Sequence, residues 1–135
     1  MNKILIAICA VFALAGCSTK EQTGLREALV EKFKDDQDLK DYKLDPGTVA
    51  DCVVKEITET LPGFAGDPRR DQFFQAYAQF INVKSANDAE KAINDFQQLF
   101  GSAKKAREAA TSLSDHIMTC IGKAIEQSDE VPQRH

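Results

Sequence analysis

Histidine and cysteine are the side chains of this sequence whose spacing could support metal chemistry. His116 and Cys120 are four residues apart, so on a helix they would share one face. A structural zinc site needs four ligands. Beyond the N-terminal region only Cys52 and His135 remain, and neither pairs at a ligand spacing. The acidic segment 35–45 lacks the central glycine of an EF-hand calcium loop. We therefore expect no metal and no cofactor.

A short segment near the C-terminus contains the residue types of a catalytic triad, namely Ser112, Ser114, Asp115 and His116. Adjacent residues of a helix point in different directions, so Asp115 and His116 would not face each other as a triad requires. The sequence also lacks the G-x-S-x-G motif that positions a nucleophilic serine. We interpret the segment as the polar face of an amphipathic helix and expect that the protein is not an enzyme.

The N-terminal residues have the pattern of an export signal. Met1-Asn2-Lys3 forms a positive start, Ile4 to Ala15 is an unbroken apolar run, and the run ends in Leu14-Ala15-Gly16-Cys17. The apolar run is shorter than the ~20 residues of a transmembrane helix. Together these residues resemble the signal peptide and lipobox of bacterial lipoproteins. An ordinary secretory signal with a chance cysteine is the alternative interpretation.

The resemblance implies that residues 1–16 are removed and that Cys17 becomes a lipidated N-terminus. Its sulfur and its amine would carry acyl chains such as palmitate, and two or three chains anchor a protein far more firmly than one. Ser18 stands where Gram-negative lipoproteins of the inner membrane have aspartate. The resemblance therefore implies the outer membrane, with the protein facing the periplasm, and residues 17–23 as lipidated N-terminus and tether.

The remaining cysteines support the same compartment. Cys9 would leave with the signal and Cys17 would carry the lipid, so Cys52 and Cys120 remain as an even pair in an exported chain. Such a pair predicts a disulfide. Two separate buried thiols are the alternative, because free cysteine packs like a small hydrophobe.

The charge balance excludes some classes of partner. The chain has 17 basic and 21 acidic residues, so the loss of Lys3 leaves a net charge of about −5. Nucleic-acid binding requires a basic surface, so we expect no nucleic-acid partner. The same charge disfavours electrostatic adhesion to anionic lipid beyond the acyl anchor.

The elements that would position these residues are helices. Apolar side chains recur at helical spacing, and strand signals are nearly absent. We expect a helical domain over 24–127 and a flexible tail over 128–135. Its helices are expected from Leu25 through Phe33 and over 48–61, 68–83, 86–100 and 103–127.

Capping residues mark the ends of several of these helices. Thr48, Asp67 and Ser85 are expected to cap the starts of helices, and Gly101 the end of one. Short connections between amphipathic helices favour an antiparallel arrangement. The predicted fold class is all-α, an antiparallel bundle of four to five amphipathic helices stapled by the Cys52–Cys120 disulfide.

One loop has the composition of a contact surface. Phe64 lies in a glycine- and proline-rich loop, Arg69 and Arg70 follow it, and Phe73 begins a dense aromatic group. Aromatic residues and arginine are enriched at interface hot spots. We therefore predict that these four residues contact a partner, although a connecting loop with solvated arginines would have the same composition.

These patterns favour a lipid-anchored envelope lipoprotein that binds another protein without catalysis. An inhibitor- or immunity-like role and an assembly-factor role both suit a small acidic helical domain with a disulfide. A carrier of a small hydrophobic ligand or lipid, and a structural envelope component, are the alternatives.

Overall fold

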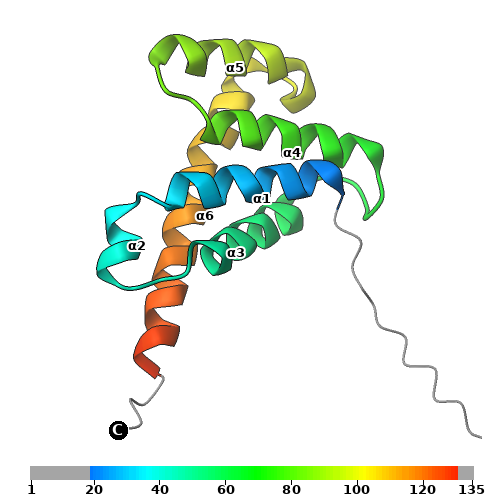
Figure 1. The fold of residues 1–135 in the computed structure, drawn as a ribbon. Helices are drawn as coiled ribbons and strands as arrows, with labels where there is room; N and C mark the ends of the chain where they lie inside the picture. The colour runs from blue at the N-terminus through cyan, green and yellow to red at the C-terminus, as the bar shows by residue number, and fades with distance from the viewer. Residues whose placement is uncertain (1–18, 131–135) are drawn as a thin grey trace, which may run out of the picture.

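The computed structural model describes residues 19–130, and these residues form six α-helices and no strand. Figure 1 shows α1, α3 and α4 packed side by side, α6 running across them, and α5 against the N-terminal part of α6. The all-α bundle predicted from the sequence is confirmed. The helices are α1 (Lys20–Phe33), α2 (Gln37–Asp41), α3 (Pro46–Thr60), α4 (Pro68–Ile81), α5 (Ala86–Phe100) and α6 (Ala103–Glu130).

The first helix begins earlier than the sequence suggested. The Thr19 hydroxyl oxygen accepts a hydrogen bond from the Gln22 backbone N–H at 3.2 Å and caps α1. Residues 20–23 therefore form the first turn of α1, and the expected tether 17–23 is too long. The physical reason is local, because lysine, glutamate and glutamine are good helix formers and follow a capping threonine.

The charged segment after α1 contains one short helix before α3 begins. Asp36 caps this helix, α2, by accepting a hydrogen bond from the Leu39 backbone N–H at 3.1 Å. The expected cap of the next helix, Thr48, is wrong. Asp45 caps α3 instead, and its carboxylate accepts a hydrogen bond from the Thr48 backbone N–H at 2.7 Å. Pro46 fits the first turn because N–H groups there have no intrahelical partner.

The other predicted caps are confirmed. Asp67 and Ser85 accept hydrogen bonds from backbone N–H groups in the first turns of α4 and α5. Gly101 adopts a left-handed conformation, with φ of +93°, at the end of α5. The last helix continues to Glu130, so the first part of the expected flexible tail 128–135 is helical.

The centre of the core lies between α1, α3 and α4. Every fourth residue of α1, from Leu25 through Leu29 to Phe33, is at most 1% exposed. This spacing places all three side chains on one face of the helix. Burial of such a side chain contributes about 1.5–3 kcal/mol, so α1 is an integral part of the bundle. The facing stripe of α3 repeats the same spacing with Val49, Val53 and Ile57.

The disulfide connects α6 to this core. The Cα atoms of Cys52 and Cys120 lie 5.8 Å apart, and the predicted bond is present. Cys120 is 1% exposed, and Leu113 and Ala106 precede it at seven-residue intervals on the buried side of α6. One stripe of α6 therefore packs against the other helices, and the disulfide fastens its C-terminal part to α3.

Candidate functional site

A groove lies where the C-terminal ends of α3 and α5 meet α4 and α6. Its volume is about 520 Å³. Most of its lining is apolar, and hydroxyl groups and one imidazole complete it. The apolar residues are Leu61, Pro62, Phe73, Leu99, Phe100 and Ala109, and the polar ones are Thr60, Tyr77, Ser112 and His116.

Aromatic rings form one wall of the groove. The centroid of the Phe100 ring lies 5.1 Å from that of Phe73 and 6.1 Å from that of Tyr77, both in edge-to-face geometry. Phe80 lies 5.9 Å from Phe100 and, on its other side, 6.2 Å from Phe96. Because edge-to-face contacts are favoured between aromatic rings, the contacts of Phe100 with Phe73 and Tyr77 stabilise this wall.

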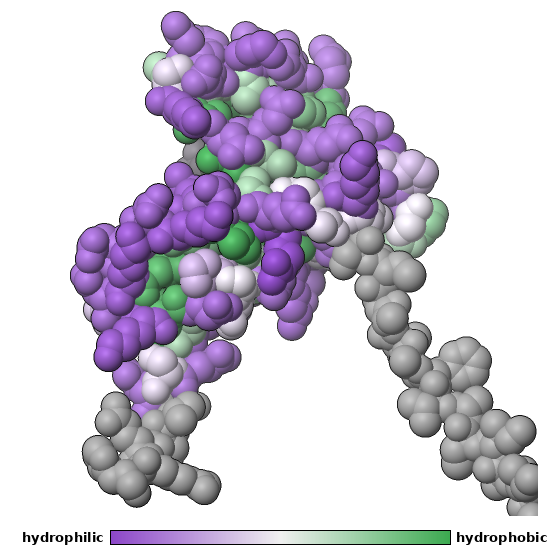
Figure 2. Space-filling model, viewed as in Figure 1, coloured by the Kyte–Doolittle hydropathy of each residue, from purple (hydrophilic) through white to green (hydrophobic). Residues whose placement is uncertain are grey.

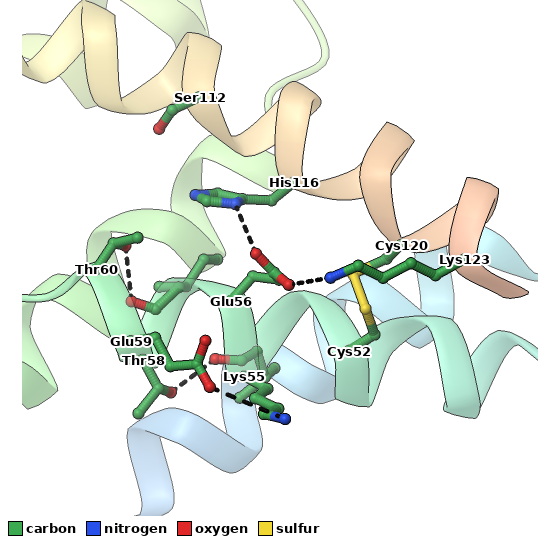
Figure 3. Close-up of polar contacts among 12 residues, drawn as sticks. Cys52, Lys55, Glu56, Thr58, Glu59, Thr60, Ser112, His116, Cys120 and Lys123 are labelled. Atoms are coloured by element: carbon green, nitrogen blue, oxygen red, sulfur yellow. Dashed lines mark hydrogen bonds and ion pairs between the residues drawn. A yellow bond between two sulfur atoms is a disulfide. The ribbon is translucent and has the colours of Figure 1, made fainter.

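Next to His116 of the groove, a group of charged side chains lies where α6 passes over α3 (Figure 3). One carboxylate oxygen of Glu56 accepts a hydrogen bond from the Lys123 ammonium at 2.5 Å, and the other lies 4.0 Å from Nδ1 of His116. The hydrogen bond and the charge of Lys123 hold the pKa of Glu56 below its usual range. This carboxylate is therefore ionised at neutral pH and links α3 to α6 beside the disulfide.

The catalytic constellation considered from the sequence does not form. Asp115 is exposed, whereas His116 is half-buried and faces the carboxylate of α3. The Ser112 hydroxyl donates a hydrogen bond to the Ala109 carbonyl at 2.8 Å, within its own helix. Burial raises the pKa of the Tyr77 hydroxyl, and Ser112 opposes this shift. The groove therefore combines apolar side chains with a few polar groups, and the serine–aspartate–histidine arrangement of a triad is not formed.

The four residues predicted to contact a partner do not share one surface. Phe73 is 8% exposed and lines the groove. Phe64 is 73% exposed at the tip of the α3–α4 loop, and Arg69 is exposed beside it. Arg70 is half-buried, and its guanidinium donates a hydrogen bond to a backbone carbonyl near the end of α3. Of these four residues, Phe64 and Arg69 are therefore the two that are exposed at this end of the molecule.

Phe64 is the first residue of a hydrogen-bonded turn in the α3–α4 loop. The Asp67 backbone N–H donates a hydrogen bond to the Phe64 carbonyl at 3.0 Å, which closes a β-turn. Gly63 and Gly66 have φ of +87° and +94°, in the region that favours glycine. The buried Asp67 carboxylate accepts hydrogen bonds from the Arg69 side chain at 2.8 Å and its backbone N–H at 2.9 Å, and these hold the pKa of Asp67 below its usual range. In Figure 2, viewed as Figure 1, a small hydrophobic area lies at the right side of the molecule, where Figure 1 draws the loop between α3 and α4.

Sequence reasoning missed most of the groove. The aromatic group of α4 was visible as a dense cluster, but Leu99 and Phe100 could only be recognised as part of an apolar stripe. Glu56 and His116 are 60 positions apart in the sequence, and nothing local pairs them. The one sequence signal for this pair was the predicted disulfide. Cys52 is one helical turn from Glu56 and Cys120 is one turn from His116, so a Cys52–Cys120 bond brings both residues together.

Comparison with known proteins gives no relative for this fold or groove. No protein-family model matches the chain, and no curated protein or solved structure matches it. Within residues 19–130 no helix is long and apolar enough to cross a membrane, and no cluster of three or more potential metal ligands occurs. The lipidation residue predicted from the sequence, Cys17, lies outside the described residues.

Proposed function

We propose that this chain is a lipid-anchored lipoprotein of the bacterial envelope, in the outer membrane and facing the periplasm, whose helical domain binds another protein. The binding is non-enzymatic, in an inhibitor- or immunity-like role or as an assembly factor. The observation that carries the binding proposal is the preformed groove of about 520 Å³ with its aromatic wall. The lipobox-like Leu14-Ala15-Gly16-Cys17 carries the proposal of a lipid anchor.

The groove suits an apolar side chain or short helical segment of a partner protein. Aromatic residues are enriched at interface hot spots, and hot spots lie in pockets that exclude water. The wall around Phe100 is held by neighbouring rings, so little conformational entropy would be lost on binding. His116 and Ser112 at the edge can exchange hydrogen bonds with the backbone of the bound segment.

A matched pair of substitutions on α6 tests the groove. Ser112 lines the groove, whereas Ser114, two residues further on, is exposed and is not among its lining residues. Ser112→Arg places a long charged side chain at the groove, and Ser114→Arg adds the same side chain elsewhere on the same helix. The domain of residues 18–135, with its disulfide formed, is used to capture partners from envelope extract, with quantitative mass spectrometry as the readout.

The proposal requires one protein that is captured by the wild-type domain and by Ser114→Arg and is lost with Ser112→Arg. Equal capture by all three would show that the groove is not the binding surface. Circular dichroism of both variants controls for folding. A separate experiment tests the anchor: the wild-type protein should fractionate with membranes and carry acyl chains on Cys17, and Cys17→Ser should lose both properties.

A second candidate is a carrier of a small hydrophobic ligand. The groove volume of about 520 Å³ lies within the range of roughly 300–1,000 Å³ that is typical of small-molecule sites. Native mass spectrometry separates the two candidates. A bound lipid or other apolar molecule, present in the wild type and in Ser114→Arg and absent from Ser112→Arg, would favour the carrier.

A further inference from the structure

The start of α1 and the exposed loop of Phe64 lie at the same end of the molecule. Thr19 and Gln22 of the α1 N-terminus line a depression of about 170 Å³ together with Ala65 and Gly66 of the α3–α4 loop. Figure 1 shows the same arrangement, with the α1 N-terminus beside the loop that leads into α4 and with α2 at the opposite end of α1. The loop therefore sits directly beside the point where the chain enters the fold.

The length of chain before α1 places this end close to any anchored lipid. Cys17 is two residues before Thr19, the cap of α1. An extended chain spans at most about 3.3–3.6 Å per residue, so the two Cα atoms can be no more than about 7 Å apart. If Cys17 carries acyl chains in the bilayer, as proposed above, the α1 N-terminus lies at the membrane surface, and the loop beside it lies there too.

The loop and the start of α4 expose one apolar and one basic side chain, Phe64 and Arg69, and both types can contact a membrane surface. Phe64 is 73% exposed on a turn that a hydrogen bond from the Asp67 backbone N–H closes, so its insertion into lipid would lose little conformational freedom. Phenylalanine, like tryptophan and leucine, is a side chain that interfacial segments bury at the boundary between headgroups and acyl chains. The Arg69 side chain, in the first turn of α4, is 74% exposed, and its guanidinium N–H groups that do not bond Asp67 can donate hydrogen bonds to phosphate. Within residues 19–130, Asp67 is the one carboxylate that forms an ion pair with Arg69.

We propose that Phe64 inserts into the lipid interface as a second membrane contact, beside the acyl anchor on Cys17. This inference rests on the proposed lipid anchor. Two contacts fix the orientation of the domain, whereas a single tether would leave it free to rotate. Pro62, two residues before Phe64, lines the binding groove, so one edge of the groove would be held near the membrane surface.

The chain contains no tryptophan, which makes a direct test possible. In the full lipidated protein, Phe64→Trp introduces a single tryptophan at the proposed contact, and its emission can be excited selectively at wavelengths where tyrosine does not absorb. Tyr42→Trp is the matched control, because Tyr42 is 54% exposed and lies just after α2, at the far end of α1. α1 has 14 residues and is about 21 Å long at 1.5 Å per residue, so the control is well removed from the anchor.

Both proteins are reconstituted into phosphatidylcholine vesicles that contain brominated lipid, a quencher of tryptophan within the bilayer. We expect Phe64→Trp to lose most of its emission, to shift to shorter wavelength and to be shielded from aqueous acrylamide. Tyr42→Trp should show none of these effects. Emission of Phe64→Trp that is unquenched by the lipid and open to acrylamide, in protein that floats with the vesicles, overturns the inference and leaves the anchor intact.

Flotation distinguishes this failure from failure of the proposed anchor. Protein that neither floats with vesicles nor carries acyl chains on Cys17 would overturn the anchor, and with it the present inference. Equal quenching of Phe64→Trp and Tyr42→Trp would also overturn it, because the domain would then have no fixed orientation on the membrane.

Discussion

Reduction of the Cys52–Cys120 disulfide should remove a large part of the stability of this domain. The bond closes a loop with a sequence separation of 68 residues. The chain-entropy model assigns a loop of this size about 4 kcal/mol, because the cross-link restricts the unfolded chain. Net stabilities of domains are about 5–15 kcal/mol, so the loss of this contribution is large. The reduced protein should therefore unfold at a clearly lower urea concentration than the oxidised protein.

Urea denaturation of residues 18–135, followed by circular dichroism with and without reductant, measures this contribution. In this segment Cys52 and Cys120 are the only cysteines, so reductant can act on no other bond. Besides the lower midpoint we expect a steeper dependence of the unfolding free energy on urea, since an unfolded chain without the cross-link exposes more surface. Reduction leaves both thiols in place, so no cavity contributes to the difference.

The double variant Cys52→Ala, Cys120→Ala is the control, and its midpoint should not respond to reductant. The reasoning would be refuted if the oxidised and reduced wild-type proteins differed by less than about 1 kcal/mol, well below the loop-entropy value. That result would mean that the unfolded chain already holds α3 and α6 together without the bond.

Further predictions concern glycines and one ion pair. Gly24→Ala should stabilise the protein by about 0.5–1 kcal/mol in thermal or urea melts, because Gly24 lies within α1 and no atom crowds an added Cβ; a destabilised variant would contradict the α1 assignment. Gly66→Ala should cost about 1–2 kcal/mol for its left-handed φ alone. Gly63→Ala should cost more in the same melts, because its Cβ would also lie 2.6 Å from the α4 capping carboxylate; equal costs would argue against the tight turn. Lys123 lowers the pKa of Glu56 in the folded state, so this pair stabilises the fold above the unfolded pKa of about 4.3 and the effect is lost as the pH falls through the lower folded value. Glu56→Gln should therefore be less stable than wild type at pH 7, and the difference should shrink as the pH is lowered below the unfolded pKa; parallel pH profiles would contradict the ion pair.

The helical fold was largely predictable because its signals are local. Apolar residues four apart in α1 and α3 predict buried helix faces, and Asp67, Ser85 and Gly101 mark helix ends through hydrogen bonds or backbone angles set within a few residues. The errors were local as well. Thr48 and Asp45 are both good capping residues, and proline at Pro46 favours the earlier start because it fits the first turn.

The candidate groove was not predictable in the same way. Phe73 could be recognised as part of an aromatic cluster, yet its contact with Phe100 depends on how α5 folds back onto α4 and α6. The predicted contact residues were also separated by the fold: Arg70 is directed to the end of α3, and Phe64 is held out by the turn. Composition singled out this loop but could not indicate which of its side chains point outward.

The sequence by itself therefore determined the helices, most of their caps and the pairing of Cys52 with Cys120, because propensity, hydrogen-bonding distance and cysteine count act through few residues. Tertiary structure alone decided that Glu56 faces His116 and Lys123, that rings from α4 and α5 form one wall, and that the Phe64 loop lies beside the start of α1. These arrangements depend on how helices cross. Crossing is set by the packing of whole faces against one another, and no short stretch of sequence contains that information.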